Sequence, residues 1–250
     1  MRLLADSQIT AATITTTNGL SFAPPEKLQI FQLDNKYKAN SGIDKIVADF
    51  NSTATNINCV ALCGSNLSSG ATVSLSYSAT STSSPEATIS LPTFSNFNQV
   101  WFLPAALNKR YWWIDVNDPD PQGSSAFELG YLYIGEYTQI DFVSFPHTPT
   151  LNIISAPSTS GTAQEYGSKV MNQNSMEFTA DFTTEELADL LEIIREKQNI
   201  DPVLLVPFED SLDNVLYPPR YGVLSSDAYA YPMAGTPGLY NIALSHRETF

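Results

Sequence analysis

Acidic and amide side chains gather between residues 115 and 120, where they could supply oxygen ligands to a calcium ion. The run contains Asp115, Asn117, Asp118 and Asp120. An EF-hand loop that began at Asp115 would need glycine at its sixth position and glutamate at its twelfth, but Asp120 and Ala126 stand there. The run therefore predicts a turn in which Asx side chains bond to their own backbone, with a calcium site of another type as the alternative.

A pair of carboxylates could also cleave a glycosidic bond, which requires two acids about 5–10 Å apart across a groove. The candidates are Asp115, Glu128 and Glu136. Because the chain has 26 acidic residues, some such pair arises without any catalytic purpose. A glycosidase built on a β-sandwich is therefore one alternative hypothesis about function.

The histidines and cysteines form no recognisable catalytic motif. His147 stands in a proline-bounded segment, His246 lies close to the end of the sequence, and no G-x-S-x-G motif supplies a nucleophile. Cys59 and Cys63 would lie about 13 Å apart on a strand, too far for a disulfide. Free, buried thiols suit a reducing compartment, whereas a two-cysteine metal clip would need further ligands. We expect no catalytic, cofactor-binding or metal-binding residue, no cofactor, and no enzymatic activity.

A set of aromatic side chains could stack on sugar rings, as in many carbohydrate-binding proteins. Aromatic residues also dominate the cores of sandwiches and the interfaces between proteins. We therefore predict a core or interface position for the set, with sugar stacking as the alternative. Its members are Trp101, Tyr111, Trp112, Trp113, Tyr131 and Tyr133.

The elements that must position these side chains are mostly strands. Alternation of apolar and polar residues predicts half-buried strands, and a continuous apolar run predicts a strand buried on both faces. Residues 57–63 form the predicted central strand, and 59–63 within it are such a continuous run. The other predicted strands of the first half are 44–50, 72–77, 98–103, 110–116 and 127–137, with Pro104 separating two of them. The pattern predicts a β-sandwich over residues 1–150.

The second half has a different pattern. Residues 151–162, which include the segment SAPSTSG, predict a linker. Beyond it, a smaller β-rich domain is expected over 163–250, with one amphipathic helix over 184–198. A capping box at Thr183 and Glu186 marks its start, and Leu187, Leu190, Leu191 and Ile194 share its apolar face. The fold class is therefore mainly β, with an α+β second domain.

Composition argues against several partners. The net charge is −14, with 12 basic residues that never cluster beyond adjacent pairs such as Lys109 and Arg110. Nucleic acids and anionic membranes both attract clustered Lys and Arg, so we expect neither as a partner. No apolar run approaches the roughly 20 residues of a membrane span, and the first residues do not resemble a signal peptide. Synthesis in the cytoplasm without membrane insertion is expected.

The arrangement resembles the structural proteins at the tail tip of long-tailed bacteriophages. The likeness rests on the strand over 46–50 followed by NINCVALCGSNLSSGATVSLSY, on RYWWIDVNDPDPQGSSAFELGYLYIGEY (Arg110 to Tyr137), and on the strand–helix–strand pattern of the second half. The chain departs from that family at Ser65, where a histidine is common, and at Tyr131, where an arginine is common.

The resemblance implies a galactose-binding-like jelly roll over 1–150 and a non-enzymatic, structural role. It implies a homo-oligomeric ring in the tail tip or baseplate that contacts the tail tube, the tape measure and the baseplate hub. The virion, assembled in the host cytoplasm, is the expected location. The alternative is a carbohydrate-binding module that recognises a glycan on the host surface.

Overall fold

The computed structural model describes residues 2–5, 7–30, 32–33, 35–51, 55–92, 98–140, 143–144, 149–159, 165–197, 201–206, 219–226, 231–232 and 238–248. The chain divides into two compact units. The first, called here the sandwich unit, holds Arg2–Thr138 together with Val206–Arg220. The second, called here the C-terminal unit, holds Gln139–Leu205 and Tyr221–Thr249. The molecule is mainly β, as predicted.

One layer of the sandwich unit is a five-stranded antiparallel sheet in the order β2-β4-β9-β6-β7. Its strands are β2 (Thr13–Thr16), β4 (Ile43–Asp49), β6 (Thr72–Ser78), β7 (Ala87–Leu91) and β9 (Tyr111–Asn117). Alternation directs one face to the core, since Ile46, Ala48, Leu75 and Ile114 are buried there. The opposite face carries the polar residues, which places it at the surface.

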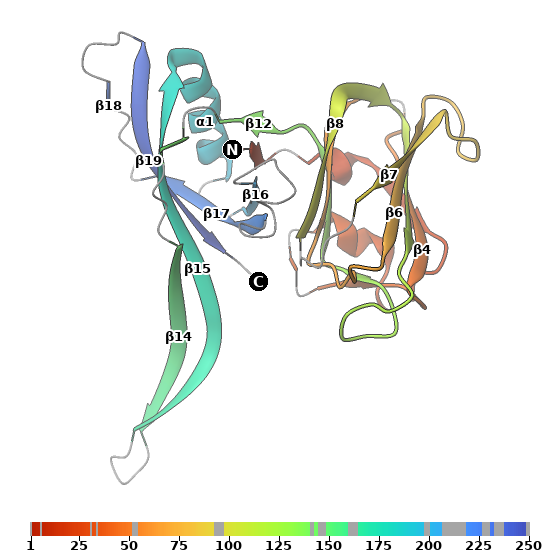
Figure 1. Cartoon of the computed structure of the whole chain (residues 1–250), viewed down its shortest axis with the longest axis horizontal. Helices are drawn as coiled ribbons and strands as arrows, with labels where there is room; N and C mark the ends of the chain where they lie inside the picture. The colour runs from red at the N-terminus through yellow and green to blue at the C-terminus, as the bar shows by residue number, and fades with distance from the viewer. Residues whose placement is uncertain are drawn as a thin grey trace. The chain divides into compact units, whose positions relative to one another are not determined.

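The other layer is a three-stranded sheet in the order β11-β5-β8, and Figure 1 shows β8 facing the strands of the first sheet. The strands are β5 (Thr55–Cys63), β8 (Asn98–Lys109) and β11 (Tyr131–Gly135). Residues 59–63 of β5 are fully buried on both faces, as the continuous apolar run predicted. The 3-10 helices η1 (Gln8–Ala11) and η2 (Pro25–Gln29) pack against β11, which explains the burial of the second face.

Pro104 does not separate two strands, contrary to prediction. It lies inside β8, where the pairing with β5 shifts between Ile57, opposite Leu107, and Cys59, opposite Phe102. Proline is tolerated here because β8 is an edge strand and the shift is a bulge, so the missing N–H breaks no ladder bond.

Short elements complete the sandwich unit. Strands β3 (Tyr37–Lys38) and β10 (Glu128–Leu129) pair with each other. In sequence, β1 (Arg2–Leu4) begins the unit, and β12 (Thr138–Gln139) spans the boundary at which it ends. Gly130 separates β10 from β11, and a Cβ there would lie 2.8 Å from Leu33 Cα. This glycine therefore allows a close approach of two backbone segments.

The C-terminal unit is built on β15 (Glu165–Thr183) and β19 (Leu239–Glu248), which pair antiparallel. Strand β17 (Arg220–Ser226) pairs with β19, and β16 (Val203–Val206) adjoins β17. The shorter β13 (Val143–Ser144) pairs with β15, and β18 (Tyr231–Pro232) pairs with β19.

The predicted helix is present as α1 (Thr184–Lys197), which begins directly after the predicted cap residue, Thr183. Leu187, Leu190 and Ile193 are its buried residues, whereas Leu191 is 37% exposed. The predicted apolar face was therefore wrong at Leu191, because the packed stripe continues through Ile193.

Most of the predicted linker is a strand. Residues Pro149–Thr159 form β14, which pairs with β15 along nearly its whole length. Serine and threonine are also compatible with a strand, so composition alone misled the prediction. The boundary between the units falls at Thr138 and Gln139, earlier than the predicted end of the first domain.

Candidate functional site

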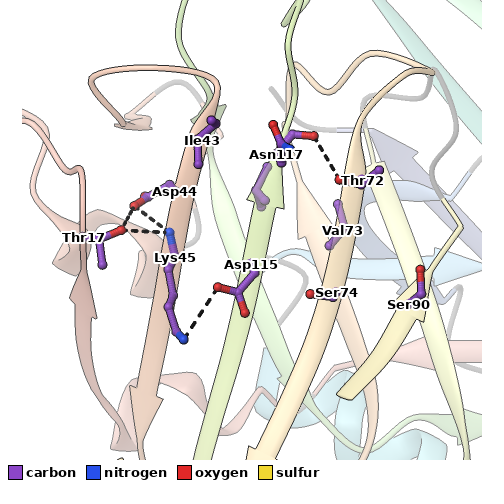
Figure 2. A pocket seen from close by; sticks show the side chains of 11 residues that line it. Thr17, Ile43, Asp44, Lys45, Thr72, Val73, Ser74, Ser90, Asp115 and Asn117 are labelled. Atoms are coloured by element: carbon purple, nitrogen blue, oxygen red, sulfur yellow. Dashed lines mark hydrogen bonds and ion pairs between the residues drawn. The ribbon is translucent and has the colours of Figure 1, made fainter. Parts of the chain in front are cut away.

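A groove on the outward face of the five-stranded sheet is the best candidate site, and Figure 2 shows it from close by. Its cavity volume is about 310 Å³. Strand register brings two rows of side chains together across β4, β9, β6 and β7. The first row is Lys45, Asp115, Ser74 and Ser90, and the second is Ile43, Asn117 and Thr72.

The centre of the groove holds one charge of each sign. Lys45 Nζ lies 3.7 Å from Asp115 Oδ1, and each side chain is 42% exposed. The Lys45 ammonium also lies 5.8 Å from the centre of the Trp113 ring, within the range of a cation–π contact. An ion pair this exposed contributes little to stability, so both groups are available to a ligand at small cost.

One wall of the groove is formed by Thr17, just after β2. Thr17 Oγ1 donates to Asp44 Oδ1 (3.0 Å) and accepts from the backbone N–H of Lys45 (3.2 Å). Figure 2 draws these bonds together with the contact between Lys45 and Asp115. The neighbouring strand β4 carries Ile43 at its start (Figure 2), and this residue is 56% exposed. The groove therefore combines many hydrogen-bonding groups with one apolar patch.

The acidic run that suggested calcium does not converge on one point. Asp115 and Asn117 face the groove, whereas Asp118 is buried and accepts from the Ser68 backbone N–H (2.7 Å) and hydroxyl (2.6 Å). Asp118 also accepts from the backbone N–H of Asp120, which is the Asx turn that the sequence predicted. Within the described residues, no group of three or more His, Cys, Asp or Glu side chains could hold a metal ion.

The proposed glycosidase carboxylates lie on different elements. Asp115 belongs to β9, Glu128 to β10, and Glu136 follows β11. Burial alone would raise the pKa of Glu128, but the hydrogen bond from Lys38 (2.6 Å) and the charges of Lys38 and Lys36 lower it overall. A general acid needs a raised pKa, so Glu128 does not have the property that this role requires.

The six aromatic side chains that could have stacked on a sugar are all buried, with 0–6% of their surface exposed. Their prediction as core residues is confirmed. Trp112 points toward the core, and Trp113 is only 1% exposed although its strand position faces outward. A sugar in the groove would therefore be held by hydrogen bonds and by Ile43 rather than by an open aromatic platform.

The cysteines are buried and free, as predicted. Burial raises the pKa of the Cys59 and Cys63 thiols, which keeps them protonated and unreactive. His246 is fully buried in β19, opposite Met176 on one side and Leu224 on the other. His147 lies outside the described residues.

The groove can exchange hydrogen bonds with a polyhydroxylated ligand. An ammonium donates, a carboxylate accepts, and hydroxyl and amide groups do both. Sequence analysis found Asp115 and Asn117 but missed Thr17, Lys45, Ser74 and Ser90. Alternation over 44–50 and 72–77 places Lys45 and Ser74 on a polar face, whereas Thr17 and Ser90 lie outside the predicted strands. Only the register between strands brings these residues into one groove. No helix in the described residues is long and apolar enough to span a membrane.

No family model matches the sequence, and no curated protein matches it. Solved carbohydrate-binding modules do match. The family 32 module of NanJ from C. perfringens, in complex with galactose, has a TM-score of 0.42 and 8% identity, and covers 55% of this chain and 100% of its own.

Chitosan-binding module 1 from the chitosanase/glucanase of Paenibacillus sp. IK-5 has a TM-score of 0.42 and 11% identity, covering 52% of this chain and 99% of its own. The lectin binding domain of Lectinolysin, complexed with Lewis b, has a TM-score of 0.40 and 11% identity, covering 52% and 96%. Because the similarity is so low, the ligands named for these modules are not transferred to this chain.

Proposed function

We propose that the sandwich unit is a carbohydrate-binding module that takes a neutral saccharide in the groove of the five-stranded sheet. The observation that supports it is the row of Lys45, Asp115, Ser74 and Ser90, which places an ammonium, a carboxylate and two hydroxyls side by side. Sugar hydroxyls both donate and accept, so such a row can satisfy several of them at once.

The charge and size of the groove narrow the ligand class. The opposite charges of Lys45 and Asp115 balance each other, which favours a neutral sugar over an anionic one. Its volume of about 310 Å³ lies at the lower end of ligand sites, so a mono- or disaccharide end is the expected occupant. Ile43 can cover the apolar C–H face of the ring.

Isothermal titration with galactose, glucose, N-acetylglucosamine and fucose tests this proposal. Asp115→Ala should weaken binding by about tenfold or more, because a hydrogen bond to a charged group contributes roughly 1.5–3 kcal/mol. Lys36→Ala is the control, since Lys36 forms a partly exposed ion pair with Glu128 at 3.9 Å and neither residue lines the groove. Absence of binding to every sugar, or equal affinities for both variants, would contradict the proposal.

A second candidate function is a structural role in an assembly, which the hairpin of β14 and β15 favours. Strand β15 pairs with β19 only from Ser175 onward. Residues 151–159 and 165–174 therefore form a two-stranded ribbon with no third strand among the described residues. Figure 1 shows this ribbon extending beyond the other strands of its unit. A two-stranded ribbon is marginally stable in water and has exposed edges, so it gains from docking on another chain.

The sequence resemblance to phage tail-tip proteins supports a specific version of this role. In that version, copies of the chain form a ring in a virion tail and contact the tail tube, the tape measure and the baseplate hub. Such a role is compatible with glycan binding, because the ribbon and the groove belong to different units.

Light scattering of the purified chain tests the assembly. A multiple of the 27.4 kDa monomer mass is expected, such as a trimer or hexamer. The ribbon can be shortened by replacing residues 153–172 with an Asn-Gly turn between Asn152 and Gln173, which keeps the β15–β19 pairing. This variant should form smaller assemblies, so the mass measured in solution should fall. A monomeric full-length chain, or an unchanged mass in the shortened variant, would count against this candidate.

A further inference from the structure

We propose that Asp44 is a positioning residue that lies beneath the groove and controls its affinity for saccharide. This inference rests on the proposed carbohydrate-binding function. Asp44 is 2% exposed and occupies an inward position of β4, between the outward-facing Ile43 and Lys45. Asp44 also borders the groove, but with so little exposed surface and four donors on its carboxylate it acts on a ligand through the residues that it holds.

The carboxylate of Asp44 is satisfied by four donors, which explains why a charge is tolerated in the core. Its Oδ1 accepts from the Thr17 hydroxyl (3.0 Å), the Asn18 backbone N–H (3.0 Å) and the Lys45 backbone N–H (2.8 Å). Its Oδ2 accepts from the hydroxyl of Tyr37, which is fully buried. Burial, and then the hydrogen bond to Asp44, raise the pKa of Tyr37, so this hydroxyl remains a donor.

The three donors at Oδ1 belong to the two segments that form one wall of the groove. The backbone N–H of Thr17 also donates to the Lys45 carbonyl (3.2 Å), and Asn18 Nδ2 donates to the Ile43 carbonyl (2.8 Å). Thr17, Ile43 and Lys45 all line the groove. One buried oxygen atom thus fixes the distance between the hydroxyl of Thr17 and the backbone that carries Lys45.

The two oxygens of Asp44 can be tested separately. Tyr37→Phe removes the donor at Oδ2 and leaves the three bonds at Oδ1 in place. Asp44→Ala removes all four bonds. Asp44→Asn can keep an oxygen toward the three donors and turn its amide nitrogen toward the Tyr37 hydroxyl, which can accept. A purely stabilising role would make Tyr37→Phe and Asp44→Ala differ only in melting temperature.

Binding of the same four sugars is measured by titration calorimetry, and amide protons are followed by NMR hydrogen exchange. Asp44→Ala should weaken binding about tenfold or more, while Tyr37→Phe should leave it within about twofold and Asp44→Asn should restore most of it. The amides of Asn18 and Lys45 should exchange faster in Asp44→Ala and not in Tyr37→Phe.

The amide measurement also keeps the inference testable if Asp44→Ala does not fold. In Asp44→Asn a neutral acceptor replaces a charged one, so the amide protons of Asn18 and Lys45 should move upfield while those in β5 stay unchanged. Unchanged amides in Asp44→Asn, or full sugar affinity in Asp44→Ala, would overturn the inference. If the amides respond but the wild-type chain binds no sugar, the positioning role stands and the proposed function fails.

Discussion

At the scale of single residues, the ion pair of Asp49 and Arg110 makes a prediction about pH. Arg110 donates from Nε to Asp49 Oδ1 (2.7 Å) and from an η nitrogen to Oδ2 (3.0 Å). The hydrogen bonds from Arg110 outweigh the effect of burial and, with the N–H of Asn51, lower the pKa of Asp49. Stability from this pair is therefore complete above the ordinary pKa of aspartate, about 4, and is lost as pH falls through the lowered value.

In Arg110→Ala, the pKa of Asp49 should rise toward its ordinary value, which NMR titration of the side-chain carboxyl can follow. The stability difference from wild type, measured by urea unfolding, should be present at neutral pH and shrink as the pH falls below about 4. Arg195→Ala on the exposed side of α1 is the control and should leave the pKa of Asp49 unchanged. An unshifted Asp49 in Arg110→Ala would show that the pair does not form in solution.

Gly130 makes a prediction about packing. A Cβ at this position would lie 2.8 Å from Leu33 Cα and 2.9 Å from Leu33 O, so the neighbouring backbone must move. Gly130→Ala should lower the free energy of unfolding by about 1–3 kcal/mol, the usual cost of overpacking. Gly70→Ala is the matched control, because its new Cβ would meet only Ser68 Oγ at 3.7 Å. Equal effects in the two variants would refute the close contact.

At the scale of elements, helix α1 should be held by one narrow face. Leu190 is 1% exposed and the adjacent Leu191 is 37% exposed. Leu190→Ala should therefore cost about 2–5 kcal/mol, the range for buried leucines, whereas Leu191→Ala should change stability by much less. Urea unfolding of the two variants gives both numbers, and a larger loss for Leu191→Ala would mean that the helix packs through another face.

At the scale of the whole molecule, the chain divides into two compact units, which we expect to respond separately to damage. Gly130 lies in the sandwich unit, and Leu190 lies in the C-terminal unit. Differential scanning calorimetry should show two transitions, with Gly130→Ala lowering one and Leu190→Ala lowering the other. A single transition that both variants lower equally would mean that the chain unfolds as one cooperative body.

The amino-acid sequence by itself determined the fold class and several elements. The apolar run over 59–63 lies in a strand and is buried on both faces. The apolar residues that recur with a period of 3.6 after Thr183 lie in a helix that begins at Thr184. These features could be predicted because alternation, continuous hydrophobicity and helix capping act over a few neighbouring residues.

Only the tertiary structure decided where the candidate site lies. Thr17, Lys45, Ser74, Ser90 and Asp115 are far apart in sequence, and they meet because β2, β4, β9, β6 and β7 pair in one register. That register depends on long-range pairing and on packing of the opposite face, which no local pattern encodes. The same reason explains why Pro149–Thr159, which has the composition of a linker, is a strand: its partner is β15.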